Sequence, residues 1–149
     1  MNLVIGSKIG ILFSGIFLLI GMLTGAWKYW EIRHSSNFRA HDYVDIAHRA
    51  SLLYAPACLI LAALAHFTIL SENVCCILVV GNILFFVASV MSYIFHGIFK
   101  DTTNQFRTPH KVAQYTLPSY LMTLFMLLLI IVEIGSTFLL VIGTFRYLF

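Results

Sequence analysis

Long runs of apolar residues, separated by shorter polar segments, dominate the pattern of this chain of 149 residues. Each of four such runs reaches the roughly 20 residues that a helix needs to span the hydrocarbon core of a membrane. Helices are favoured because lipid cannot satisfy backbone polar groups. The pattern therefore predicts four transmembrane helices, at about residues 9–27, 48–70, 74–99 and 117–148.

The composition agrees with an integral membrane protein. Hydrophobic residues make up 60% of the chain and charged residues only 10%, whereas soluble domains carry about 25% charged residues. The predicted helices occupy most of the length, which leaves little mass outside the membrane. We therefore expect an all-α fold in which residues 1–149 form a single four-helix transmembrane bundle. The sequence shows no nucleotide or nucleic-acid motif, so we expect no nucleic-acid partner.

The basic residues are unevenly divided between the two ends of this bundle. Most of them lie in or beside the first and third loops: Lys28, Arg33, Arg39, Arg49, Lys100, Arg107 and Lys111. Only Lys8 and Arg146 lie at the other end. Because cytoplasmic loops are enriched in lysine and arginine, we expect a multi-pass protein of the inner (cytoplasmic) membrane with both termini outside the cytoplasm.

Most histidines lie at the same end as the basic loops. His48 begins the second predicted helix, and Asp45 precedes it by three residues, on the same helical face. Three explanations of His48 remain open: an ordinary interfacial helix start, a ligand of a metal or a haem iron, and proton transfer. As a ligand, its ring would be oriented from behind by Asp45 or by a backbone carbonyl.

His96 is an alternative second ligand, because antiparallel packing of the second and third helices brings it to the level of His48. Neighbouring helices pack about 8–10 Å apart, which is cramped for a haem ligated from both sides by these two helices. A single histidine ligand with an open position opposite is easier to build. An open position favours catalysis over electron transfer.

Five short stretches stand out along the chain: GMLTG at 21–25, RAH at 39–41, AH at 47–48, NQF at 104–106 and LPSYL at 117–121. They resemble stretches of the styrene oxide isomerases and the hydroxylaminobenzene mutases, two related groups of small four-helix membrane enzymes. Their order, the chain length and the four-helix layout agree over nearly the whole chain. The resemblance implies a homo-oligomer, a trimer, with haem b near the subunit contacts and a second-helix histidine, here His48, as the iron ligand.

The resemblance also implies that ferric haem acts as a Lewis acid on a small lipophilic substrate, epoxide-like or an N-hydroxy compound, which enters from the membrane lipid. The candidate catalytic residues are Tyr54, Tyr93 and Asn104. Tyr54 stands where the family has an asparagine. The candidate cofactor-binding residues are Asp45, His48, Arg49, Arg107 and Lys111. Among them, the cations Arg49, Arg107 and Lys111 could pair with haem propionates.

Two other functions remain open. One is a haem b electron-transfer subunit of a membrane complex, in which two histidines ligate the iron. The other is a small membrane subunit without enzymatic activity, whose histidines are merely interfacial.

Glu133 is an acid inside the fourth predicted helix. A charged residue at the centre of a membrane helix costs about 2.5–3.5 kcal/mol on insertion scales, so we expect it to be neutral or paired. Counting residues from the cytoplasmic ends of the second and fourth helices puts His66 at the same depth. We therefore expect His66 and Glu133 to interact.

Overall fold

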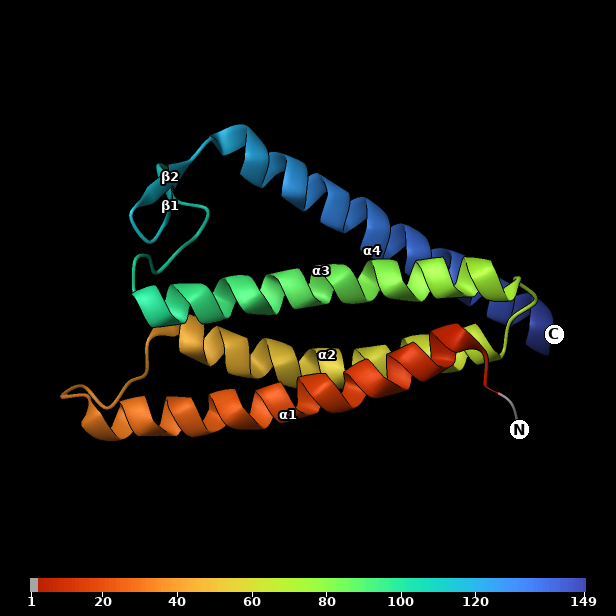
Figure 1. Cartoon of the computed structure of the whole chain (residues 1–149), viewed down its shortest axis with the longest axis horizontal. Helices are drawn as coiled ribbons and strands as arrows, with labels where there is room; N and C mark the ends of the chain where they lie inside the picture. Colours follow the sequence, from red (N-terminus) through yellow and green to blue (C-terminus); the bar gives the residue numbers. More distant parts are fainter. Residues whose placement is uncertain (1–2) are drawn as a thin grey trace.

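The computed structural model describes residues 3–149, and this part of the chain contains four long α-helices (Figure 1). They are α1 (Ile5–His34), α2 (Asp42–His66), α3 (Glu72–Phe99) and α4 (Ser119–Leu148). All four are long and apolar enough to cross a membrane. The predicted all-α, four-helix transmembrane fold is therefore confirmed, and the chain is a multi-pass membrane protein.

The first loop is much shorter than predicted, because α1 ends later and α2 begins earlier. Only residues 35–41 lie between the two helices. The extension of α1 places Glu31 inside the bundle, where its carboxylate accepts the backbone N–H of His41 at 2.8 Å and pairs with Lys100 at 3.1 Å. These contacts stabilise the polar end of α1 and the polar start of α2, which cannot be located from hydrophobicity alone.

Helices α1, α2 and α3 enclose most of the core. The closest approach is between α1 and α2, where a Cβ atom at Gly10 would lie 2.9 Å from the backbone carbonyl oxygen of Cys58. Nearby, the Ser7 hydroxyl donates to the Ala62 carbonyl at 2.7 Å. Small residues thus let two backbones meet and exchange hydrogen bonds inside an apolar medium. The core itself includes Phe17, Cys58, Leu61, Val79, Val90 and Leu140.

Helix α4 packs closely on the other helices near its C-terminal end and diverges from α3 toward its start (Figure 1). Near the end, the Thr144 hydroxyl donates to the Leu64 carbonyl at 3.1 Å, and the Gly143 carbonyl accepts the N–H of Ile69 at 3.3 Å. The third loop, residues 100–118, contains an antiparallel hairpin of β1 (His110–Val112) and β2 (Tyr115–Leu117). This hairpin connects the separated ends of α3 and α4.

The predicted pair of His66 and Glu133 does not form. Nδ1 of His66 and Oε1 of Glu133 are both buried, and neither has a hydrogen-bond partner among the described residues. The bonds from Leu64 and Ile69, on either side of His66, place it level with residues 143–144 of α4. That level is about ten residues from Glu133, or about 15 Å along a helix. The equal depth of His66 and Glu133 was predicted by counting residues from the predicted helix starts. That count was wrong because α2 begins earlier than predicted and α4 is inclined to α3 (Figure 1).

Candidate functional site

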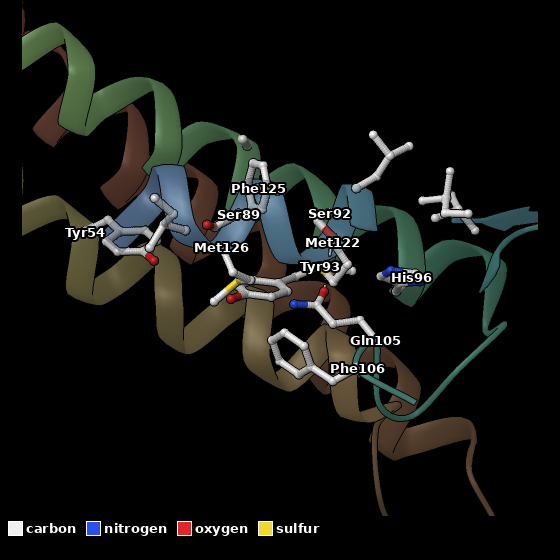
Figure 2. A pocket seen from close by; sticks show the side chains of 15 residues that line it. Tyr54, Ser89, Ser92, Tyr93, His96, Gln105, Phe106, Met122, Phe125 and Met126 are labelled. Carbon is white, nitrogen blue, oxygen red and sulfur yellow. Dashed lines mark hydrogen bonds between the residues drawn. The ribbon is translucent and has the colours of Figure 1, made fainter. Parts of the chain in front are cut away.

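A cavity of about 450 Å³ lies between α3 and α4, at the end that carries the third loop (Figure 2). Its apolar wall includes Ala88, Leu121, Met122, Phe125, Met126 and Leu129. Its polar side chains are Tyr54, Ser89, Ser92, Tyr93, His96 and Gln105. A mostly apolar cavity with a few convergent polar groups has the usual form of a binding site for a small molecule.

Two of the candidate catalytic residues, Tyr54 and Tyr93, line this cavity (Figure 2). Tyr54 reaches it from α2 and stacks on Phe86 of α3, with ring centroids 4.2 Å apart and planes 10° apart. Tyr93 comes from α3 and lies nearer to the third loop. The fold therefore brings together two tyrosines that are far apart in the sequence.

The third candidate, Asn104, lies outside the wall of the cavity, on the exposed part of the third loop. Its side-chain oxygen accepts the backbone N–H of Phe106 at 2.9 Å, and its carbonyl accepts the Thr102 hydroxyl at 3.0 Å. Asn104 thus shapes the loop, while its neighbour Gln105 contributes the amide that faces the cavity.

His96 lies at the loop end of the cavity and is held by Asp101. Its Nδ1 lies 2.7 Å from Oδ1 of Asp101, and the two side chains are only 4% and 7% exposed. Oδ2 of Asp101 accepts the backbone N–H of Ala113 at 2.5 Å. Burial works to raise the pKa of the Asp101 carboxyl, but the hydrogen bonds from His96 and Ala113 outweigh it, so this pKa lies below its ordinary value. The carboxylate therefore anchors both the imidazole and the hairpin.

Tyr43 supports the same end of the cavity, although the sequence analysis did not single it out. It is 3% exposed, and its hydroxyl oxygen accepts the backbone N–H of Gln105 at 2.5 Å. Its ring centroid lies 4.9 Å from that of His96. The signal for its burial is the four-residue spacing of Tyr43, Ala47, Ser51 and Ala55, which marks one face of α2.

His48 points to a different neighbour, the backbone of α1. Its Nδ1 lies 2.7 Å from the carbonyl oxygen of Gly21. Its ring rests against Gly25, where an added Cβ would lie 2.8 Å from the ring carbon Cε1. A carbonyl only accepts, so Nδ1 carries the proton, and Nε2 of the neutral ring keeps a lone pair. The side chain is half-buried, and no hydrogen bond joins Nε2 to a described residue.

Asp45 does not orient the ring of His48. Its Oδ1 lies 2.5 Å from Nζ of Lys28, and its Oδ2 lies 2.9 Å from the Arg49 guanidinium. Of the two orienting groups considered from the sequence, the backbone carbonyl of Gly21 is the one that the structure shows. Asp45 instead links the last turns of α1 to the first turns of α2, and Arg49 remains 66% exposed.

Of the two candidate cations of the third loop, Arg107 makes no observed contact with His48. Arg107 is exposed, and its backbone N–H donates to the Asn104 carbonyl at 3.0 Å within the loop. The side chain of Lys111 lies outside the part of the chain that the structure describes.

His48 and His96 are directed at different partners, His48 at the α1 backbone and His96 at Asp101 and Tyr43. Among the residues that the structure describes, no three histidine, cysteine, aspartate or glutamate side chains lie close enough together to hold a metal ion. Of the coordination modes considered from the sequence, ligation by one histidine fits this arrangement better than ligation by both.

Comparisons of the chain with family models, curated proteins and solved structures find no match. The resemblance to the isomerases and mutases therefore stays a hypothesis that rests on the short stretches quoted above. The candidate site is assessed from its own geometry: one oriented histidine facing α1, and one cavity with a polar end between α3 and α4.

Proposed function

We propose that this chain is a membrane enzyme of the isomerase or mutase type that binds haem b through His48. The observation that carries the proposal is the hydrogen bond between Nδ1 of His48 and the Gly21 carbonyl. Histidines that ligate a metal almost always donate their other ring N–H to a carbonyl, a carboxylate or water, which fixes the ring and its tautomer. Nε2 of His48 is thereby prepared as a ligand.

Apolar and charged groups of the kinds that an apolar cofactor with one charged edge would need lie beside His48. Gly25 leaves a notch in α1 that accommodates the imidazole, and Leu52, one turn further along α2, packs against Gly21. Arg49 follows His48 directly and is largely exposed, so it would be available to a propionate at the water boundary. When bound, haem b would supply a Lewis-acidic iron for an oxygen or nitrogen function of the substrate.

We assign the binding of the substrate, a small lipophilic molecule from the bilayer, to the cavity between α3 and α4. Tyr54 and Tyr93 offer hydroxyl groups there, and much of the remaining wall is apolar. Within one copy His48 contacts α1, whereas the cavity lies beyond α2, between α3 and α4. A haem on His48 would therefore be separated from a substrate in the cavity of the same copy. In the homo-trimer that the resemblance implies, His48 of one copy could meet the cavity of a neighbouring copy.

We also place the protein in the inner (cytoplasmic) membrane with both termini outside the cytoplasm. The start of α1 and the end of α4 lie at the same end of the bundle, opposite the first and third loops (Figure 1). Seven of the nine lysines and arginines lie at the loop end, which the positive-inside rule assigns to the cytoplasm.

The haem content per copy and the absorption spectrum of the purified protein test this proposal. We expect a five-coordinate haem that binds external ligands and is lost in His48→Ala. His41→Ala is the matched control, because His41 caps α2 at the same end and its ring accepts the N–H of Tyr43 at 3.3 Å instead of facing Gly21. It should keep the haem.

Each other result supports a different function. A six-coordinate low-spin spectrum favours the electron-transfer subunit with two histidine ligands. Full haem in His48→Ala, with loss in His41→Ala or His96→Ala, assigns the ligand elsewhere. A colourless protein that cannot take up added haem contradicts the haem proposal and favours the subunit without enzymatic activity.

A further inference from the structure

The geometry points to a second role for the cavity between α3 and α4. We propose that His96 and Asp101 form a dyad that binds the hydroxyl group of a small, neutral, lipophilic molecule, with Nε2 of His96 accepting the hydroxyl proton in a hydrogen bond. The proposal names the class of ligand for the cavity of the proposed enzyme, but it does not depend on haem.

The first step is the free ring nitrogen of His96. The Asp101 carboxylate can only accept, so the 2.7 Å contact places the proton on Nδ1 of His96. When the ring is neutral, Nε2 carries a lone pair, and no hydrogen bond joins it to a described residue. The side chain is 4% exposed and lines the cavity. A hydroxyl group of a ligand in the cavity could donate to this nitrogen.

The second step is the fixed orientation of the ring. Asp101 is held by the Ala113 N–H on one oxygen and by His96 on the other. The Tyr43 ring covers the imidazole at a centroid distance of 4.9 Å. The dyad is therefore arranged before a ligand arrives, and such preorganisation lowers the entropy cost of binding.

The third step is a second polar group that lines the same cavity, the side-chain amide of Gln105. Ser92 donates to the side-chain oxygen of Gln105 at 3.3 Å, which leaves the amide N–H₂ of Gln105 as a donor on the cavity side (Figure 2). A hydroxyl group both donates and accepts, so a hydroxyl that donates to His96 can also accept from a donor that lines the cavity. An ether or a hydrocarbon cannot satisfy His96.

The fourth step is the nature of the rest of the molecule. The remaining wall is apolar and includes Phe125, Met122 and Met126, which suit an aromatic or branched hydrocarbon body. No lysine or arginine lies among the described residues that line the cavity. A carboxylate or phosphate would thus find no counter-charge among these described residues, which favours neutral alcohols and phenols as the matching ligands.

Two probes of nearly equal shape test the inference: 2-naphthol, which has a hydroxyl, and 2-methoxynaphthalene, which has no donor. Binding to the full-length protein in lipid nanodiscs is measured by equilibrium dialysis, with empty nanodiscs to subtract partition into lipid. We expect saturable binding of one 2-naphthol per copy, about fivefold tighter than 2-methoxynaphthalene, the effect of one net hydrogen bond.

The variant His96→Phe keeps an aromatic ring beside Tyr43 and removes the acceptor. It should bind the two probes equally, and retained binding of 2-methoxynaphthalene shows that the cavity is intact. His34→Gln is the matched control, because His34 is exposed at the end of α1 and bonds only to the Trp30 carbonyl. It should preserve the fivefold preference.

A second measurement needs no variant. In protein labelled with ¹⁵N-histidine, the Nε2 resonance of His96 should be of the unprotonated type and should shift on addition of 2-naphthol but not of 2-methoxynaphthalene. Equal affinity of both probes, no saturable binding, an unchanged preference in His96→Phe, or a protonated Nε2 would each overturn the inference. Haem content of the same samples separates the two proposals, since His48→Ala should lose haem and keep 2-naphthol binding.

Discussion

Nδ1 of His48 lies 2.7 Å from the carbonyl oxygen of Gly21, and this hydrogen bond joins the second turn of α2 to the middle of α1. The ring reaches that carbonyl across Gly25, one turn further along α1. A side chain at Gly25 would occupy the space of the imidazole, with its Cβ 2.8 Å from Cε1 and 3.0 Å from Nδ1 of His48. The position of the histidine thus depends on the absence of a single carbon atom.

The first prediction is that Gly25→Ala displaces His48 from Gly21. We expect a loss of about 1–3 kcal/mol in the free energy of unfolding, as for other overpacked sites, together with a lower haem content per copy. Gly15→Ala is the matched control, because a Cβ at Gly15 has no neighbour within 4 Å. Equal stability and haem content in the two variants would show that Gly25 does not position the ring.

The second prediction concerns the contact between α1 and α2 at Gly10. A Cβ there would lie 2.8 Å from Cβ of Ala62 and 2.9 Å from the backbone oxygen of Cys58, and backbone cannot rotate away. Gly10→Ala should therefore destabilise the bundle by about 1–3 kcal/mol. Gly135→Ala in α4, with open space around it, should be neutral or slightly stabilising through helix propensity. Unfolding in detergent measures both, and a neutral Gly10→Ala would contradict the close approach.

The third prediction is a pH dependence of the hairpin in the third loop. The pKa of the Asp101 carboxyl is lower in the folded protein than its ordinary value, which is about 3.9. Its stabilising contribution is therefore complete above about pH 4 and is lost as the pH falls through the folded pKa. Exchange of the Ala113 amide hydrogen, corrected for its intrinsic rate, should accelerate below about pH 4.

Asp101→Asn should remove this pH dependence, because the amide does not titrate. Asp42→Asn is the control, since Asp42 is exposed at the start of α2 and should leave the exchange profile unchanged. A profile that is the same in Asp101→Asn and in the unmodified protein would assign the effect to another group.

The fourth prediction is that His66 and Glu133 act independently. Because they lie at different depths of the bundle, His66→Ala and Glu133→Gln should change the free energy of unfolding additively, within about 0.3–0.5 kcal/mol. Thr137 and Asn82 provide the comparison, because the Thr137 hydroxyl lies 3.4 Å from the Asn82 side-chain oxygen. Thr137→Val and Asn82→Ala should couple by about 0.6 kcal/mol, the average for such bonds in membranes. Stronger coupling between His66 and Glu133 than between Thr137 and Asn82 would contradict the prediction.

The fifth prediction is the orientation of the protein in the membrane. Alkaline phosphatase is active only outside the cytoplasm, so its fusion after Phe149 should be active and its fusion within the third loop inactive. The expectation follows from the basic residues at the loop end of the bundle. The opposite pattern of activities would place the termini inside.

The amino-acid sequence by itself determined the fold class. Spanning a membrane requires about 20 consecutive apolar residues that satisfy their own backbone hydrogen bonds, and this requirement is local, so it can be read from hydropathy. The same pattern located α3 and α4 within a few residues of their observed bounds. It also placed Tyr54, Tyr93 and His96 toward the end of the bundle where the cavity lies.

Only the tertiary structure decided how the polar groups are paired. Glu31 stabilises the end of α1 through Lys100, which is 69 residues away in the chain, and His48 bonds to Gly21 instead of to the nearby Asp45. Such pairs depend on helix rotation, depth and inclination, which small residues set through close contacts between helices. Hydrophobic periodicity carries no information about these distances. The sequence therefore suggested Asp45, which is near His48 in the chain, as a partner of its imidazole, whereas the observed partner is the Gly21 carbonyl.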